Sequence, residues 1–224
     1  MLRNFLSGGD PKAFIIDLLL CLPIILLSLS LHEAAHGIAA NKLGDPTAKN
    51  LGRITLNPVK HLDPIGFICM LLCGFGWANP VPINSRYFKN PRRDMAISAA
   101  AGPISNVLLA FVFAILLKIS YLTLPSIITT EAALEIAYIL VRFLTIGVSL
   151  NITLAVFNLL PVPPLDGSRV LYVFLPPKQY FGVMKYERYI SLGIMLLLFL
   201  GVLDPMISFA STKIARLIFL AVGL

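Results

Sequence analysis

Long apolar runs constrain this chain more than any other feature of its sequence. Five of them are long enough, or nearly so, to cross a bilayer, whose hydrocarbon core takes about 20 apolar residues of helix. These runs are 13–40, 95–118, 134–160, 186–203 and 206–222. Lipid offers the backbone no hydrogen-bond partners, so we expect these runs to be helices. Because the composition is also 58% hydrophobic and only 13% charged, the sequence predicts an all-α integral membrane protein.

A sixth apolar run, 64–76, is too short for an ordinary span. Basic residues flank it on both sides, which favours a re-entrant segment that returns to the side from which it entered. A short true span is the alternative. We therefore expect about five to six transmembrane helices and a re-entrant segment, all in a single domain over 1–224.

The basic residues indicate how the chain is oriented. Twelve of the 18 lysines and arginines lie in three short loops: Lys42, Lys49, Arg53 and Lys60; Arg86, Lys89, Arg92 and Arg93; Arg169, Lys178, Lys185 and Arg188. Short loops rich in Lys and Arg stay on the cytoplasmic side of a cell membrane. The net charge of +7 therefore reflects multi-pass topology in a lipid bilayer, and we expect no nucleic-acid partner.

The end of the first apolar run carries the motif His32-Glu33-Ala34-Ala35-His36. Side chains at i and i+4 share one face of a helix, so both imidazoles can reach one metal ion, with Glu33 beside them to deprotonate a water. Two ordinary core histidines beside a chance glutamate are the alternative. Three unexplained polar groups in hydrocarbon would be costly, however. The motif predicts one Zn²⁺ ion, with Glu33 as the catalytic base.

A catalytic zinc site also needs a third protein ligand and an open position. Lys42 stands where the longer motif HExxHxxGxxH would supply a histidine, so the third ligand must be distant. His61 is one candidate, although its polar loop favours a surface histidine. Asp166 is the other, since prolines within 161–164 must end the preceding helix and leave this aspartate on an extended segment. Spacing alone does not separate a ligand from a solvated aspartate here.

Two short stretches favour an extended backbone over a helix. Residues 52–57 (GRITLN) alternate apolar and polar side chains, and residues 79–84 (NPVPIN) contain two prolines. We expect short extended strands near the active site, which could pair with an unwound substrate. Ordinary interfacial loops are the alternative.

These motifs together resemble the site-2 protease family of intramembrane zinc metalloproteases, in a compact form without PDZ or CBS domains. HEAAH at 32–36 and PPLDG at 163–167 match the two zinc motifs of that family. AGPISN at 101–106 is similar to its GPxxN helix, and FGWANPVPIN at 75–84 is similar to a loop of its compact members. The motifs occur in the order that the family shows.

The resemblance implies a zinc site made by His32, His36 and Asp166. It also implies that Asn106 and Asn158 bind substrate or stabilise the oxyanion, although an interhelical hydrogen bond is the alternative for each. The implied activity is hydrolysis of peptide bonds within or near transmembrane helices, as in regulated intramembrane proteolysis. Substrates would be single-pass or small membrane proteins, and the active site would face the cytoplasmic side.

Two other classes of function remain open from the sequence. A metal-ion transporter would need ligands at several membrane depths, whereas the polar groups here gather at one depth and no inverted repeat is visible. A non-catalytic scaffold that binds membrane helices would have no use for Glu33.

Overall fold

The fold is all-α, as the sequence predicts. A computed structural model describes residues 10–73, 76–176, 179, 182–183 and 185–224, without the side chains of 70–73. Its longer helices are α2 (Pro11–Lys42), α5 (Pro91–Ile127), α6 (Glu131–Asn158), α9 (Glu187–Phe199) and α10 (Asp204–Val222). Its shorter ones are α3 (Thr47–Asn50), η1 (Pro58–Lys60), α4 (Pro64–Cys73), η2 (Ser85–Tyr87) and α7 (Asp166–Leu171).

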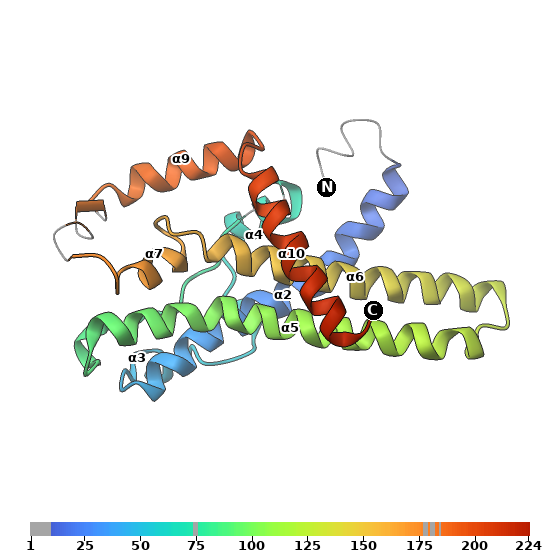
Figure 1. The fold of residues 1–224 in the computed structure, drawn as a ribbon, viewed down its shortest axis with the longest axis horizontal. Coiled ribbons are helices and arrows are strands. Elements are labelled where there is room, and N and C mark those ends of the chain that lie inside the picture. The colour runs from blue at the N-terminus through green and yellow to red at the C-terminus, as the bar shows by residue number, and fades with distance from the viewer. Residues whose placement is uncertain (1–9, 74–75, 177–178, 180–181, 184) are drawn as a thin grey trace.

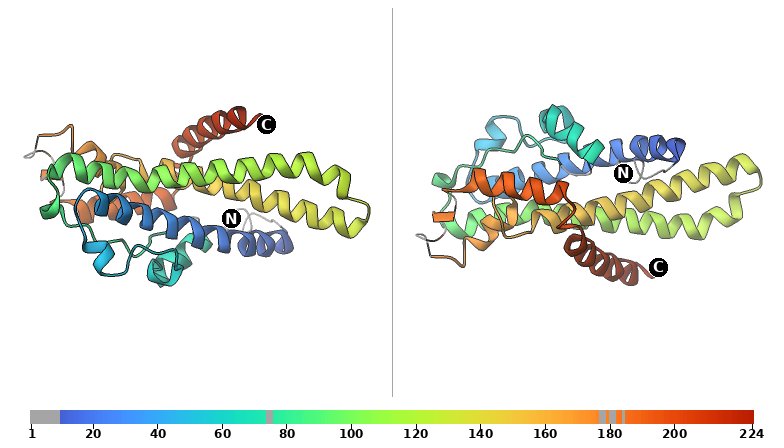
Figure 2. Two further views of the ribbon diagram at one scale, coloured as in Figure 1. Left: turned by 90° about the horizontal axis from the view of Figure 1, so that it is seen from below. Right: turned by 90° about the horizontal axis from the view of Figure 1, so that it is seen from above.

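Three long helices form the body of the molecule. Helix α5 contacts both of the others: α6 runs along most of its length, and α2 packs on another side (Figures 1 and 2). The core between them includes Ile24 of α2, Phe113 of α5 and Ile152 of α6. Gly147 lets α6 lie close to α5, because a Cβ at this position would lie 2.6 Å from the ring of Phe113. Helix α10 crosses α5 and α6 (Figure 1).

Four helices of the described part are long and apolar enough to span a membrane: α2, α5, α6 and α10. The predicted span 186–203 contains only the 13-residue helix α9, about 20 Å long at 1.5 Å per residue and shorter than the hydrocarbon core. The predicted count of five to six spans therefore stays a prediction. So does the re-entrant path of 64–76, whose residues 74–75 lie outside the described residues, as does Lys178 of the third basic loop.

No strand occurs among the residues that the structure describes. An isolated antiparallel bridge joins Leu62 to Ala78, and the stretches 52–57 and 79–84 run beside α2 as irregular loops. The expected pairing of these stretches with a substrate stays a prediction.

Candidate active site

The two histidines of the HEAAH motif face each other on α2. His32 and His36 are both buried, and their Nε2 atoms lie 3.0 Å apart. Glu33 lies beside them and is also buried. One turn of helix separates i from i+4, so this part of the geometry follows directly from the motif.

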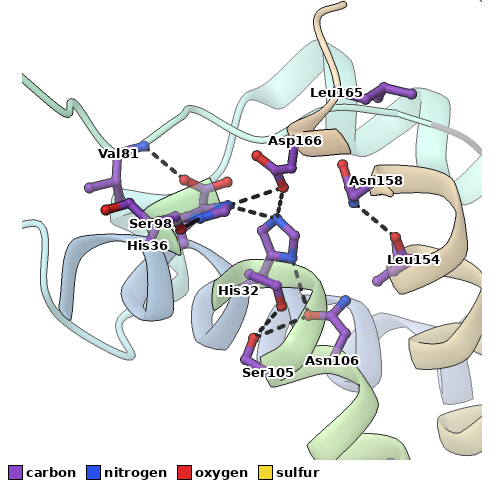
Figure 3. A network of polar contacts seen from close by, with 12 residues as sticks. His32, His36, Val81, Ser98, Ser105, Asn106, Leu154, Asn158, Leu165 and Asp166 are labelled. Carbon is purple, nitrogen blue, oxygen red and sulfur yellow. Dashed lines mark hydrogen bonds and ion pairs between the residues drawn. The ribbon is translucent and has the colours of Figure 1, made fainter. Parts of the chain in front are cut away.

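Asp166 completes the group from a distant part of the chain (Figure 3). Its Oδ2 atom lies 3.1 Å from His32 Nε2 and 3.2 Å from His36 Nε2. The expectation of an extended segment at this aspartate is wrong, because Asp166 is the first residue of the short helix α7.

Gly167 explains how α7 reaches the histidines. Helix α6 ends at Asn158, ahead of the prolines, and the chain turns back on itself. A Cβ at Gly167 would lie 2.2 Å from the backbone oxygen of Leu159, so only glycine lets α7 lie against the end of α6. That contact brings Asp166 to α2.

The hydrogen-bond partners of the outer ring nitrogens define which nitrogen faces the centre. His36 Nδ1 donates to the backbone oxygen of Ser98 at 2.8 Å, and His32 Nδ1 donates to Asn106 Oδ1 at 3.2 Å (Figure 3). Because Nδ1 carries the hydrogen of each neutral ring, Nε2 presents a lone pair to the centre. Such outer partners are characteristic of metal-binding histidines.

These three atoms fit a zinc ion. With both rings neutral, two imidazole lone pairs and a carboxylate oxygen converge, and this arrangement favours a cation at their centre. Tetrahedral zinc with bonds of about 2.0–2.1 Å sets its ligand atoms about 3.3 Å apart, close to the observed 3.0–3.2 Å. In the part of the chain that the structure describes, the one group of His, Cys, Asp or Glu side chains whose spacing suits a metal ion consists of His32, His36 and Asp166.

Gly102 makes room for the two rings. A Cβ at this position of α5 would lie 2.5 Å from both Cε1 and Nε2 of His36, and 2.7 Å from Cε1 of His32. The glycine of AGPISN therefore lets α5 lie directly against the imidazoles. The sequence singled out this motif but not the role of its glycine.

His61, the other candidate for the third metal ligand, lies outside the metal group. His61 is buried, with Nε2 donating to the Thr55 backbone oxygen at 2.9 Å. The prediction of a surface histidine is therefore wrong, and His61 does not join the metal group. Its backbone oxygen also accepts a hydrogen bond from the Asn79 N–H at 2.8 Å.

The two asparagines differ from each other. Asn106 is buried and holds His32 through its Oδ1 atom, while its Nδ2 atom has no hydrogen-bond partner. Asn158 donates from Nδ2 to Leu154 O of its own helix at 3.0 Å (Figure 3). Their roles toward substrate or oxyanion stay predictions.

Two contacts of the site could not be predicted from the sequence. The backbone oxygen of Ser98 accepts from His36, and the backbone N–H of Val81 donates to Glu33 Oε2 at 2.7 Å. Every residue except proline has both backbone groups, so no residue pattern marks the ones that serve a site.

The chain is similar in sequence to a known family of metalloproteases. Residues 20–201 match the sequence model of peptidase family M50. The chain is 41% identical over 199 residues to "Putative zinc metalloprotease YwhC" of Bacillus subtilis, covering 86% of this chain and 88% of that protein. It is 28% identical over 178 residues to "Putative zinc metalloprotease Rip2" of Mycolicibacterium smegmatis, covering 77% of this chain and 64% of that protein.

A third relative comes from an archaeon. "Putative zinc metalloprotease MJ0611" of Methanocaldococcus jannaschii is 37% identical over 109 residues, which are 48% of this chain and 49% of that protein. No solved structure matches the chain. The matched regions, the apolar helices and the metal-binding group all agree, and the chain belongs to peptidase family M50, the site-2 protease family of membrane zinc metalloproteases.

Proposed function

We propose that this chain hydrolyses a peptide bond within or near a transmembrane helix of a membrane-protein substrate, as in regulated intramembrane proteolysis. The supporting observation is that His32, Glu33 and His36 belong to α2, one of the candidate spans. Residues on such a helix meet a substrate inside the bilayer rather than in bulk water. Single-pass or small membrane proteins are the substrates that suit this position.

Each residue of the site has a defined role in this proposal. His32, His36 and Asp166 would hold one zinc ion, which would supply a Lewis acid and make water nucleophilic at neutral pH. Glu33 takes a proton from the attacking water and passes it to the leaving amine. The Ser98 carbonyl and the Asn106 amide hold the imidazoles in the orientation that ligation needs.

The substrate must also change shape. In a helix each carbonyl is hydrogen-bonded to the amide four residues on, which shields the peptide bond. Cleavage therefore requires local unwinding, and residues that weaken a helix near the scissile bond favour it. Glycine does so by about 1 kcal/mol relative to alanine.

The active site faces the cytoplasmic side in this proposal. Helix α2 ends at Lys42, and Asp166 is followed by the basic loop that contains Arg169 and Lys185. Short basic loops are retained in the cytoplasm, so both zinc motifs lie toward that face.

The direct test is cleavage of a model single-pass helix by the purified protein in lipid vesicles. We expect a chelator to abolish cleavage and added zinc to restore it. Glu33→Gln should keep one zinc per chain and lose at least about 100-fold of the rate, because an amide cannot take the proton. His36→Ala should lose both zinc and activity.

Three outcomes would count against the proposal. Appreciable cleavage by the Glu33→Gln variant would show that Glu33 is not the base. Zinc flux across the vesicle membrane without cleavage would indicate a metal-ion transporter. Binding of the helix without cleavage, equal in wild type and Glu33→Gln, would indicate a non-catalytic scaffold.

A further inference from the structure

Glu33 is held by a backbone donor from a distant segment. The Val81 N–H donates to Glu33 Oε2 at 2.7 Å, and the two residues are only 6% and 7% exposed. A buried carboxylate is stable only when its oxygens have hydrogen-bond partners. This donor lies 48 residues away in the chain, so the contact depends on how segment 79–84 is placed.

The sequence of segment 79–84 isolates this donor. Pro80 and Pro82 flank Val81, and neither has an N–H of its own. A proline also restricts the residue before it to extended conformations. Val81 therefore presents the one N–H between Asn79 and Ile83, on a stiff backbone.

Both ends of segment 79–84 are anchored. At one end, the Asn79 N–H donates to the His61 backbone oxygen at 2.8 Å, and Arg53 Nη2 donates to the Asn79 oxygen at 2.8 Å. At the other end, the Asn84 N–H donates to Oδ2 of Asp45, a fully buried carboxylate, at 2.6 Å. These contacts fix where the Val81 N–H points.

Helix α2 has no side chain at Gly37, where segment 79–84 lies against it. A Cβ at Gly37 would lie 3.1 Å from Ile54 Cγ1 and 3.4 Å from Val81 Cγ1. Gly37 follows His36 directly, so the helix that carries the catalytic motif also leaves space for the segment that contacts Glu33.

The geometry points to a positioning role for segment 79–84: through the Val81 N–H, anchored by Arg53 and Asp45, it orients the Glu33 carboxylate for proton transfer. This inference rests on the proposed function, in which Glu33 is the base. It differs from the expectation that this segment pairs with substrate, because the Val81 N–H is already engaged by the enzyme's own carboxylate. Misplacing a catalytic group by about 1 Å can cost about 100-fold in rate.

The first experiment removes the donor. Val81→Pro deletes the N–H, and Val81→Ala keeps the N–H as the matched control. With a single-pass helix substrate in lipid vesicles, we expect Val81→Pro to lower kcat about 10- to 100-fold with KM and zinc content unchanged. Val81→Ala should stay within about threefold of wild type. Equal kcat values for the two variants would overturn the inference, and a raised KM with normal kcat would instead indicate substrate pairing.

A second pair of variants covers the case in which Val81→Pro does not fold. Arg53→Gln removes the anchor on Asn79, whereas Arg86→Gln removes the same charge from an exposed site nearby. We expect a lower kcat for Arg53→Gln alone, again with zinc retained. If both variants keep the wild-type kcat, the anchoring has no role in catalysis and the inference fails.

A third measurement does not depend on activity. Hydrogen exchange can be measured in a peptide fragment that covers residues 79–84. Because the two prolines have no amide hydrogen, few amides contribute to the signal and Val81 is one of them. We expect Glu33→Ala to speed exchange at Val81, while Glu33→Gln, which keeps an acceptor, preserves protection. Unchanged protection in Glu33→Ala would refute the contact itself. If protection follows this pattern but Glu33→Gln still cleaves, the proposed function fails and the contact stands.

Discussion

The three ionisable residues of the HEAAH motif each have an identifiable partner outside the motif. His36 donates to a backbone oxygen of α5, His32 donates to Asn106 of the same helix, and Glu33 accepts from Val81. Intramembrane ionisable groups are costly unless other groups satisfy them. The two imidazoles therefore have their outer Nδ1 atoms hydrogen-bonded to α5, while their inner Nε2 atoms converge with Asp166 Oδ2.

Gly102 is the residue whose replacement tests this arrangement most simply. In Gly102→Ala the new Cβ would lie 2.5 Å from His36 Nε2, on helices that cannot move apart without breaking the core. Overpacking of this kind costs about 1–3 kcal/mol, and here it displaces His32 and His36, the two histidines proposed to bind zinc. We expect zinc content to fall markedly and cleavage to fall at least tenfold, as measured by metal analysis and substrate turnover.

The matched control for this variant is Gly193→Ala. A Cβ at Gly193 of α9 meets nothing within 4 Å, and alanine favours a helix by up to about 1 kcal/mol. Its zinc content and activity should equal those of wild type. A Gly102→Ala protein with full zinc would show that the close approach of α5 is not needed for the site.

At the scale of elements, the short helix α7 is what joins the two zinc motifs. It begins at Asp166, after the turn that follows α6. Its position depends on Gly167 lying against the Leu159 carbonyl. The aspartate reaches α2 because of this docking rather than because of its neighbours in sequence.

Replacing Asp166 and replacing Gly167 should therefore both lower the affinity for zinc, for different reasons. Asp166→Ala removes a ligand, and we expect zinc affinity to fall by more than the roughly 10–100-fold typical of losing a partner outside the ligand shell. Gly167→Ala keeps the ligand but pushes α7 away from the Leu159 oxygen, which should also weaken zinc. Competition with a fluorescent chelator measures both affinities. Wild-type affinity in Asp166→Ala would mean that the ion has only two protein ligands, or another third one.

At the scale of the whole molecule, α2 and α6 are connected at two separate places. At one end they carry or lead to the zinc group. Toward the other end, Arg142 of α6 forms an ion pair with Asp17 of α2, with Nε and Nη2 each 2.8 Å from Oδ1. Their side chains are 24% and 29% exposed, so the pair is partly withdrawn from solvent.

This ion pair should stabilise the helix arrangement without contributing to the metal site. We expect Arg142→Gln and Asp17→Asn each to lower the thermal midpoint, and the double variant to lose less than the sum. The coupling should be on the order of 1–3 kcal/mol, as for hydrogen bonds to charged groups. Thermal unfolding in detergent measures the cycle, with zinc content as the control that should not change. Additive effects would show that the pair contributes nothing to stability.

Short-range patterns in the sequence were sufficient to predict the helical membrane class and the local half of the site. Both depend on short-range patterns: apolar runs of sufficient length, and the i, i+4 spacing that places His32 and His36 on one face of one helix. The resemblance in the motifs added Asp166 and the family. Residue patterns also predicted the end of α6 near its prolines, because proline cannot continue a helix interior.

Tertiary structure decided everything that joins distant segments. The contacts of Asp166 with α2, of Ser98 with His36 and of Val81 with Glu33 join residues from 48 to 134 positions apart, and two of them use backbone groups that every residue shares. His61 was expected at the surface but is buried, and its backbone oxygen accepts a hydrogen bond from the Asn79 N–H of another segment. Asp166 was expected on an extended segment but begins a helix that lies against the end of α6. In each case the conformation is stabilised by packing against another segment. A local pattern of residues cannot predict such contacts, because it carries no information about which segments lie together.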